Sequence, residues 1–553
     1  MSRQYMDKVH VGRRIQRQKN GDIYVLERTT KYDPKTKKTI TIGQKLLGKI
    51  KPGSNEIVPT RPKCKPGEKR VVTIRKHTGL TDILEYVGRE SGIDAEIRES
   101  FNRGDADKIL SLARYWLATG GATLPHLEAW QIMHPLPYSD GMSEDTCSDL
   151  FKSVGRNEDG VQNYFKKRAS HLTLNPAIAL DSTTISSYST NQIEARQGFN
   201  KDGDGLNTVK LLTLYSVKDR EPIAFAKQPG NIPDVISIKN ALSQLDCLGV
   251  EDPMIVTDNG YYSQGNMEEF IRKDIKFLTL VDTDITWVRN AIDELKDKID
   301  EMGSVCPFDY MINGATLTRA HEFKDHQEAK LYVHVYHSLE NVTKREMALK
   351  SELMLLKKQI EEGVKEFTVS AQKKIDKYLI ISRTDKVTVE FNEKAIAEAK
   401  KYFGYFALVG NQQLSTFEAL ENYRLREKIE EFFAEQKGSF DSRRTRVWYP
   451  DSLRGRQFVQ FVGLGYHCYL RKRLKDIEES LGQNANAKTK GELAQENKLK
   501  AWLSQRSLAQ VLEWFDCIET TQVETKASVI RWSTESTQRD RLLLSLLGVI
   551  PPS

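Results

Sequence analysis

Two aspartates follow apolar runs that are typical of buried strands. Asp181 closes the run Ala177 to Leu180, and Asp258 follows the run Met254 to Thr257, which would place each at or near a strand end. Strand ends at one edge of a sheet can bring two acids together, and their mutual repulsion favours metal capture. Hard divalent cations prefer carboxylate ligands. Two such ions about 4 Å apart can stabilise the attacking and leaving oxygens in phosphodiester hydrolysis or transesterification.

A third carboxylate lies on a predicted helix whose start is marked by the capping box Ser415-Thr416-Phe417-Glu418. The spacing of three, four and seven residues places four polar side chains within an arc of roughly 60°: Tyr423, Arg426, Glu430 and Lys437. The apolar side chains cluster about 110° away, so the helix can pack on a core while it presents this stripe. A carboxylate flanked by cations suits a metal beside phosphates. A solvated stripe of i,i+4 ion pairs is the alternative interpretation.

The charge distribution indicates a polyanionic partner. Net charge is +7, yet residues 1–80 hold 21 Lys or Arg against 6 Asp or Glu, so the remainder is acidic. A second basic cluster comprises Arg443, Arg444, Arg446, Arg454 and Arg456. A solvated basic face would explain one charge run, but two clusters favour nucleic acid. We therefore expect a nucleic-acid partner, which the family resemblance given below narrows to double-stranded DNA, with Arg443, Arg444 and Arg446 among the contacts.

Composition and periodicity predict a multidomain globular protein of the α/β class. Hydrophobic residues make up 39% and charged residues 29% of 553 positions, which argues against general disorder. No apolar run reaches membrane length, and the basic first twenty residues lack a signal-peptide hydrophobic region, so a cytoplasmic location is expected. The six cysteines form no C-x-x-C pair, which suggests neither a zinc knuckle nor a disulfide framework.

Changes in pattern divide the chain into six segments. A mixed sheet is expected to form the core, and the turn Lys201 to Gly205 fits a hairpin better than a calcium loop. The expected segments are a basic β-hairpin arm (1–80), a helical N-terminal domain (81–170), the first part of the core (171–283), an α+β insertion domain (284–403), the second part of the core (404–470) and a helical C-terminal region (471–553).

These residues resemble a known family. Asp181 in Asp-Ser-Thr-Thr, Asp258 in Asp-Asn-Gly-Tyr and the Tyr-x2-Arg-x3-Glu-x6-Lys signature that ends at Lys437 resemble the DDE transposases of bacterial insertion sequences. The resemblance is to the insertion-sequence-four superfamily, and most closely to its 1634-type subgroup. It extends over roughly residues 175–465 and includes Lys201-Asp202-Gly203 and Pro229-Gly230-Asn231 with Asp234.

The resemblance implies an RNase H-like core that holds two Mg²⁺ or Mn²⁺ ions on Asp181, Asp258 and Glu430. It implies cleavage and strand transfer at the terminal inverted repeats of a mobile element, and insertion into target DNA. Tyr423, Arg426 and Lys437 would hold phosphates near the element end. A nucleoid-associated protein that acts on DNA as a homodimer is expected. Some relatives flip a base onto an aromatic of the insertion. Trp287 is a candidate, although core packing is the favoured interpretation.

Three alternatives remain at this point. The first is a DNA-binding protein of transposase origin that no longer cuts, against which the complete carboxylate set argues. The second is another RNase H-like nuclease, which would have little need for a large insertion and a basic arm. A metal-dependent phosphatase or a scaffold is disfavoured by the charge pattern. His171 and His467 are interpreted as structural.

Overall fold

A computed structural model of the chain describes residues 9–19, 21–33, 35–51, 53, 56–58, 71–322, 328–383, 387–484, 487–525, 528–534 and 536–549. The chain divides into two compact units, one of residues 1–74 and 521–531 and one of residues 75–520 and 532–553. Among the described residues, no helix combines the length and apolarity needed to cross a membrane.

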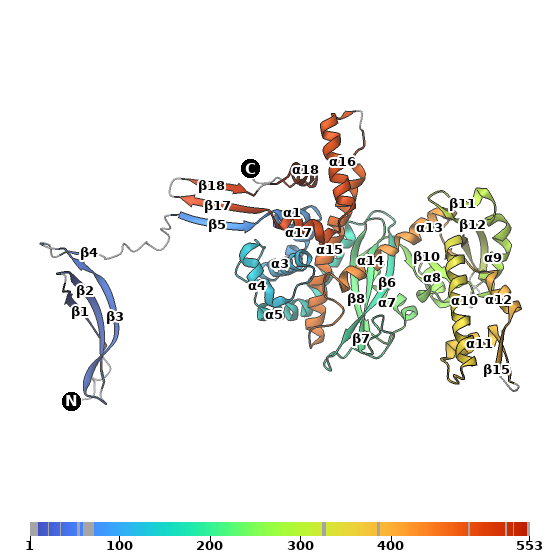
Figure 1. The fold of residues 1–553 in the computed structure, drawn as a ribbon, viewed down its shortest axis with the longest axis horizontal. Helices are drawn as coiled ribbons and strands as arrows, with labels where there is room; N and C mark the ends of the chain where they lie inside the picture. Colours follow the sequence, from blue (N-terminus) through green and yellow to red (C-terminus); the bar gives the residue numbers. More distant parts are fainter. Residues whose placement is uncertain are drawn as a thin grey trace. The chain divides into compact units, whose positions relative to one another are not determined.

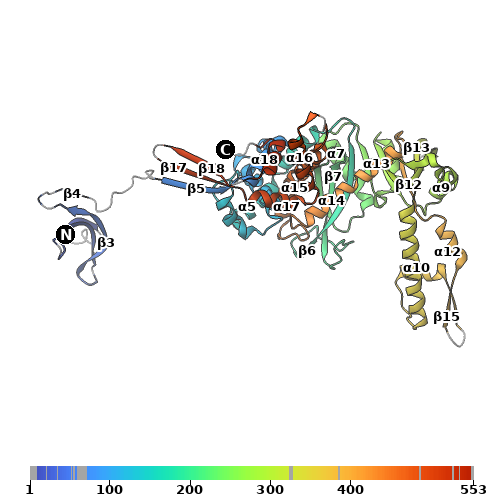
Figure 2. The ribbon, with the colours of Figure 1, turned by 45° about the horizontal axis from the view of Figure 1, so that its top comes forward.

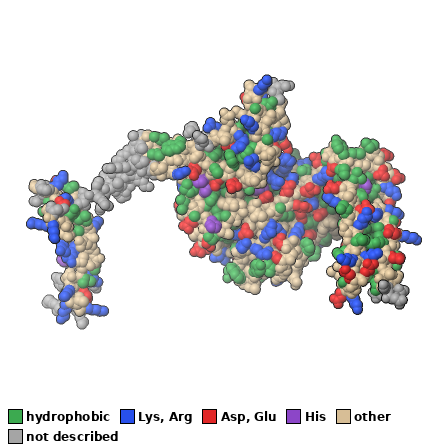
Figure 3. All heavy atoms as spheres, viewed as in Figure 1, with side chains coloured by type: hydrophobic (Ala, Val, Ile, Leu, Met, Phe, Trp, Pro, Cys, Tyr) green, Lys and Arg blue, Asp and Glu red, His purple; other side chains and the backbone are tan. Residues whose placement is uncertain are grey.

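The first unit contains an antiparallel sheet with the strand order β1-β2-β3-β4. Its strands are β1 (Val9–Arg17), β2 (Ile23–Asp33), β3 (Lys38–Ile50) and β4 (Ile57–Val58). The β-hairpin expected within residues 1–80 is formed by β2 and β3, whose last pair is Asp33 with Lys38; Pro34, in its turn, lies outside the described residues. Val25 and Leu26 are the buried apolar side chains among the described residues of this sheet. Figure 3 shows Lys and Arg side chains along its length.

Six helices begin the second unit: α1 (Gly79–Glu90), α2 (Ile93–Ser100), α3 (Arg103–Thr119), α4 (Leu127–Met133), α5 (Glu144–Arg156) and α6 (Glu158–Ser170). A 31-residue helix, α15 (Pro450–Ser480), packs against α3, α5 and strand β8 of the large sheet (Figure 1). Its crossing with α5 requires glycine, because a Cβ on Gly455 would lie 2.0 Å from the Phe151 carbonyl oxygen. The helical N-terminal segment therefore shares its core with α15. This helix also continues through residue 470, where a boundary between the core and the C-terminal region was expected.

A nine-stranded mixed sheet forms the centre of the second unit (Figure 2). Its first five strands in chain order are β6 (Ala177–Ser187), β7 (Asn207–Ser216), β8 (Glu221–Pro229), β9 (Met254–Thr257) and β10 (Lys276–Val281). β6, β7 and β8 form an antiparallel meander, and β9 and β10 lie parallel to β6 on its other side. Helices α7 (Asp234–Leu248) and α8 (Gln264–Arg272) connect these strands. The predicted mixed α/β class is confirmed.

The segment expected to be a separate insertion differs from that expectation. After α9 (Thr286–Ile299), the strands β11 (Val305–Cys306), β12 (Asp309–Glu322) and β13 (Glu328–Ser338) join the large sheet. They do so through β16 (Tyr405–Gly410), which is antiparallel to both β10 and β13. The edge of β10 is thereby covered by further strands, which satisfies backbone groups that an exposed edge would leave unpaired. The first part of residues 284–403 therefore belongs to the core sheet.

The rest of that segment has a small core of its own. It consists of α10 (Leu339–Glu361), α11 (Val369–Tyr378), β14 (Leu379–Arg383), β15 (Val387–Phe391) and α12 (Glu393–Lys400). Leu353, Ile375 and Val389 are among the buried side chains of this core. This subdomain is the part of the expected insertion that packs separately from the main core.

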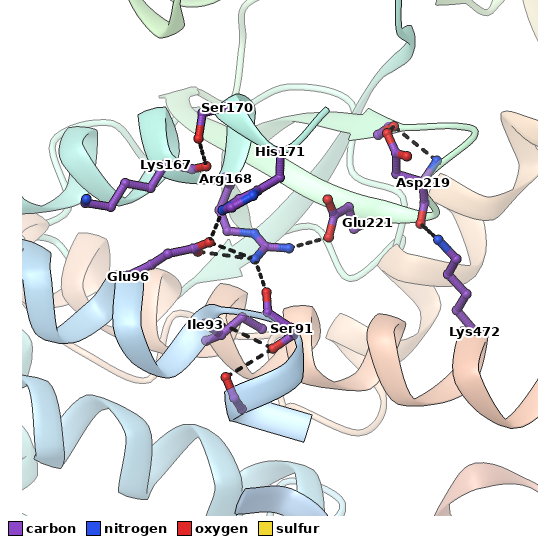
Figure 4. A network of polar contacts seen from close by, with 12 residues as sticks. Ser91, Ile93, Glu96, Lys167, Arg168, Ser170, His171, Asp219, Glu221 and Lys472 are labelled. Carbon is purple, nitrogen blue, oxygen red and sulfur yellow. Dashed lines mark hydrogen bonds and ion pairs between the residues drawn. The ribbon is translucent and has the colours of Figure 1, made fainter. Parts of the chain in front are cut away.

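A buried ionic network joins the N-terminal helices to the sheet (Figure 4). The Arg168 guanidinium on α6 lies 3.2 Å from Glu96 Oε2 on α2, and it pairs with Glu221 on β8. It also donates to the Ser91 carbonyl oxygen at 2.8 Å, and His171 Nε2 lies 2.8 Å from Glu96 Oε1. Arg168 and Glu96 are 4% and 5% exposed. The helices and the sheet are thus fixed to each other by paired charges.

The C-terminal region was expected to be helical, and this is only partly correct. Helices α16 (Lys490–Ser504), α17 (Leu508–Asp516) and α18 (Gln538–Leu547) are interrupted by strands β17 (Glu519–Thr525) and β18 (Val529–Ser533). These strands form a three-stranded sheet with β5 (Val71–His77), in the order β18-β17-β5. The residues of β17 include Thr520, Thr521 and Val523, whose branched Cβ atoms favour an extended backbone.

Candidate active site

Sheet register places Asp181 and Asp258 side by side. The parallel ladder between β6 and β9 ends at the pair Leu180 and Thr257. Asp181 and Asp258 are the residues that directly follow this pair in the two segments. Asp181 was expected at or near a strand end, and it lies within β6, one residue beyond the end of the ladder with β9. That strand continues because its antiparallel pairing with β7 extends to Ser187. Asp258 follows β9 and begins a 3-10 turn, Asn259–Tyr261.

The third carboxylate comes from a pair of short helices where one helix was expected. The capping box of Ser415 and Glu418 is confirmed, and it starts α13 (Thr416–Leu425). Arg426 ends that helix and begins α14 (Glu427–Lys437). Glu430 is in the first turn of α14, with its side chain 57% exposed. The break lies inside the Tyr-Arg-Glu-Lys stripe and separates Tyr423 from the glutamate.

Arg426 connects the carboxylates. Its Nη1 lies 3.5 Å from Asp181 Oδ2, and its Nη2 donates to Glu430 Oε1 at 2.9 Å. The guanidinium carbon is 5.2 Å from the centre of the Tyr423 ring. The residue is 5% exposed, and its buried Nε has no hydrogen-bond partner. Arg426 was expected to contact phosphates, but in this structure its charge faces the acids.

The electrostatics of the site favour a cation. The pKa of the Asp181 carboxyl is raised from 3.8 to about 6, chiefly by burial and also by the Asp258 charge, against the opposing effects of Lys201 and Arg426. The Tyr423 hydroxyl donates to Asp258 Oδ1 at 3.1 Å, and burial raises the pKa of this hydroxyl well above its usual value. Tyr423 therefore remains a neutral donor. Two adjacent acids and a third that shares their arginine form a donor set of oxygens that suits hard divalent cations.

Further polar residues contact β6 next to Asp181, at Ser182. The Lys201 Nζ donates to the Ser182 carbonyl oxygen at 2.8 Å, which places a positive charge near Asp181. Ser182 Oγ donates to Asp234 Oδ1 at 2.8 Å, and the buried Lys210 Nζ lies 2.8 Å from the same oxygen. Lys201 and Asp234 belong to motifs found in the sequence, but their roles depend on contacts across the sheet. Lys210 had no sequence signal beyond a lysine within an apolar strand.

Lys437 pairs with an aspartate that is not one of the three acids of the site. Its Nζ lies 3.1 Å from Asp202 Oδ1, in the loop between β6 and β7. The side chain is 14% exposed. The four residues of the stripe therefore have different surroundings. Tyr423 and Arg426 contact Asp258 and Asp181, Glu430 shares Arg426 with Asp181, and Lys437 contacts the loop between β6 and β7.

The three arginines expected to contact DNA lie on a loop that continues the surface of β6. Ser186 donates its amide to the Arg443 carbonyl oxygen at 3.1 Å. The side chains of Arg443 and Arg446 are exposed. Arg444 is partly buried, and it pairs with Asp204 at 2.5 Å. The loop thus presents two exposed guanidinium groups.

The remaining two arginines of that cluster are used inside the protein. Arg454 pairs with Glu158 at the start of α6. Arg456 is 6% exposed, and its guanidinium carbon lies 5.0 Å from the centre of the Trp116 ring. Burial lowers the pKa of Arg456 to about 10. Helix packing places both side chains against the N-terminal helices, which the sequence cluster did not predict.

The residues interpreted as structural have structural contacts. Trp287 on α9 is partly buried against the main core, as favoured from the sequence. His171 is exposed, and it pairs with the buried Glu96 at the edge of the network of Figure 4. His467 on α15 is buried, and its Nε2 lies 3.6 Å from Glu435 Oε2. Burial lowers the pKa of His467.

Comparison with known proteins gives a family match. A family model described as "Transposase DDE domain" matches residues 173–458, a range that includes all three carboxylates. A solved structure, the piggyBac transposase synaptic complex with hairpin DNA, is similar with a TM-score of 0.35 and 10% sequence identity. That similarity covers 79% of this chain and 81% of the other. No curated protein matches the chain.

Proposed function

The chain belongs to the transposase DDE domain family, and we propose that it binds the ends of a mobile DNA element and catalyses metal-dependent cleavage and transfer of their strands. One observation carries the proposal. Asp181 and Asp258 are adjacent in register, and Arg426 bridges Asp181 to Glu430. These contacts bring together acids from three separate elements.

The donor set fits two divalent cations. Asp181, Asp258 and Glu430 would hold Mg²⁺ or Mn²⁺, which when bound stabilise charge on the attacking and leaving oxygens of a phosphodiester. Asp181 is the residue that most needs such an ion, because burial disfavours its charged form. The exposed side chain of Glu430 leaves this corner of the site open to solvent.

The other residues of the site position these acids. Tyr423 fixes the orientation of Asp258 through its hydroxyl, and Arg426 balances the charge of Asp181 and Glu430. Lys201 holds β6 and contributes a second positive charge near Asp181. We assign these three residues to positioning, and we assign phosphate contacts to Lys437 and to the exposed Arg443 and Arg446.

Several further features belong to the same proposal. The strand order β8-β7-β6-β9-β10 supports an RNase H-like core, with the subdomain of α10–α12 as its insertion. The basic sheet of β1–β4 would bind DNA outside the active site, at terminal repeats or target DNA. We also propose that the chain comes from a bacterial insertion sequence of the 1634-type subgroup, acts as a homodimer on DNA and associates with the nucleoid in the cytoplasm.

The decisive experiment separates catalysis from DNA binding. Labelled DNA carrying the ends that flank the gene is incubated with the full chain and Mg²⁺, and cleaved and joined products are resolved on gels. Asp181→Asn, Asp258→Asn and Glu430→Gln should each lose both products, while end affinity, measured with Ca²⁺, stays within a few fold of the wild type. Lys437→Ala should show the opposite pattern, with end binding weakened by roughly 1 to 3 kcal/mol.

The alternatives predict different results in the same assay. A DNA-binding protein that no longer cuts would bind the ends but yield no product with the wild-type chain. Another RNase H-like nuclease would cleave DNA without joining it and without preference for the element ends. Cleavage by the Asp181→Asn variant within tenfold of the wild type would remove that residue from the site.

A further inference from the structure

Two histidines and an aspartate from three distant segments meet outside the elements that carry the DDE acids. His77 is the last residue of β5, His134 directly follows α4, and Asp516 is the last residue of α17. One ligand atom from each lies within 4.8 Å of the other two. The proposed function uses none of these residues.

His134 has an oxygen acceptor at each ring nitrogen. Its Nδ1 lies 2.7 Å from the Trp130 carbonyl oxygen, and its Nε2 lies 2.8 Å from Asp516 Oδ1. The ring is stacked on the Trp130 indole with centroids 3.7 Å apart, and the residue is 5% exposed. A neutral imidazole carries one N–H, so it can satisfy one of these acceptors and would turn a lone pair toward the other.

His77 also has an oxygen atom near each ring nitrogen. Its Nδ1 lies 2.7 Å from the Asp516 carbonyl oxygen and 3.6 Å from Asp516 Oδ1, and its Nε2 lies 3.5 Å from Glu519 Oε1. The His77 and His134 ring centroids are 4.7 Å apart. Two imidazolium ions at this separation would repel each other. A divalent cation between the two rings would accept one ring-nitrogen lone pair from each histidine.

We propose that His77, His134 and Asp516 form a second divalent-metal site, of the nitrogen and oxygen type that binds Zn²⁺. Zinc bonds of about 2.0 to 2.2 Å in a tetrahedron separate neighbouring ligand atoms by about 3.3 Å. The distances from Asp516 Oδ1 to His134 and His77, 2.8 and 3.6 Å, lie on either side of that value.

The surroundings of His134 match those of a metal ligand. A metal-bound histidine donates its other ring N–H to a carbonyl or carboxylate, which fixes the ring and its tautomer. Trp130 provides that carbonyl and also the aromatic face against which the ring is packed. His134 Nε2 is then free to coordinate through its lone pair, directed toward Asp516.

The role of the site is structural. His77 and Asp516 are 439 residues apart in sequence, and His134 and Asp516 are 382 apart. A metal bound to all three would tie β5 and α4 to α17, and so join the beginning and the end of the second unit. Because the unfolded chain holds no such arrangement, binding would stabilise the folded state.

The test uses the full chain with Asp181→Asn and Asp258→Asn, so that the DDE acids contribute little to metal binding. Chelator-treated protein is titrated with Zn²⁺ by calorimetry, and bound zinc is counted after gel filtration. One equivalent is expected. Adding His134→Gln or Asp516→Asn should weaken zinc binding at least tenfold, while His126→Gln, at an exposed histidine outside the cluster, should leave it unchanged.

Two results would overturn the proposal. One is the absence of stoichiometric zinc binding by the chain with an intact cluster, a measurement that requires no substitution in the cluster and is unaffected by any folding defect. The other is unchanged zinc affinity in a folded His134→Gln variant. Either result would show that the cluster does not hold a metal. A raised midpoint of thermal unfolding with Zn²⁺, absent in the Asp516→Asn variant, would support the structural role.

Discussion

Arg426 and Asp181 form a buried ion pair, with the guanidinium Nη1 3.5 Å from the carboxylate Oδ2. The same guanidinium reaches Glu430 through Nη2. Arg426 thus supplies, in the metal-free protein, part of the positive charge that bound cations would supply. We therefore expect the contribution of the Arg426–Asp181 ion pair to the free energy of unfolding to depend on whether a metal is bound.

We expect Arg426→Ala to destabilise the metal-free protein by roughly 1 to 3 kcal/mol, because Asp181 loses a charged partner in a buried position. In millimolar Mn²⁺ the loss should shrink, since the metal then neutralises the carboxylates. Denaturant unfolding with and without Mn²⁺ measures both values. An equal loss under the two conditions would mean that Arg426 does not compensate the charge of the acids.

Metal binding should depend on pH through Asp181. Burial raises the pKa of this carboxyl from 3.8 to about 6, so the folded state keeps its proton in a window where the unfolded state has lost it. Without metal, stability should fall as pH rises through that window, by up to about 3 kcal/mol relative to Asp181→Asn. Mn²⁺ affinity should rise over the same window, because the proton competes with the metal.

Calorimetric titrations with Mn²⁺ between about pH 5 and pH 7.5 would measure the affinity change. Parallel unfolding curves of the wild type and Asp181→Asn would measure the stability change. Stability curves of constant separation across the window would contradict the raised pKa.

Tyr423→Phe should impair cleavage and leave DNA binding intact. The hydroxyl donates to Asp258 at 3.1 Å, and loss of a hydrogen bond that orients a metal ligand lowers activity by roughly 10- to 100-fold. Tyr402→Phe is the matched control, because its hydroxyl donates to Asp293 at 3.0 Å on an exposed surface. End binding that weakens as much as cleavage would instead place Tyr423 on the DNA.

Arg168→Ala should destabilise the protein by about 3 to 5 kcal/mol. The substitution leaves Glu96 and Glu221 without the cation that both share (Figure 4), and an unpaired buried charge is costly. Lys167→Ala removes the neighbouring ion pair with the exposed Glu99 and should cost less than about 1 kcal/mol. Comparable losses for the two variants, measured by denaturant unfolding, would contradict the anchoring role of Arg168.

Removing the basic sheet should weaken DNA binding and flatten its salt dependence. Residues 1–58 hold 14 Lys or Arg against 5 Asp or Glu, and each lost phosphate contact lowers the slope of log affinity against log salt by about 0.9. The triple substitution of Arg13, Arg14 and Arg17 by Gln, on the exposed strand β1, tests charge without deleting the sheet. Unchanged slopes in titrations of both proteins would exclude this sheet from DNA binding.

Local patterns determined the chemistry of this protein. The aspartates are recognisable because each follows an apolar run, and Glu430 is recognisable because it belongs to a polar stripe that follows the capping box at Ser415. The mixed α/β class likewise follows from the alternation of period-two and period-3.6 segments. All these signals act over a few residues, so they can be read from the chain alone.

The contacts that these residues make depend on the tertiary fold. Asp181 meets Asp258 because the β6 and β9 ladder ends at Leu180 and Thr257, and no local pattern sets that register. Strands β11–β13 extend the core sheet because β10 has an edge that β16 can pair, a choice made between distant segments. Arg426 faces the acids because its helix breaks there and the core buries it. Contacts such as His134 with Asp516 depend on closing long loops, whose partners are selected by packing rather than by neighbouring residues.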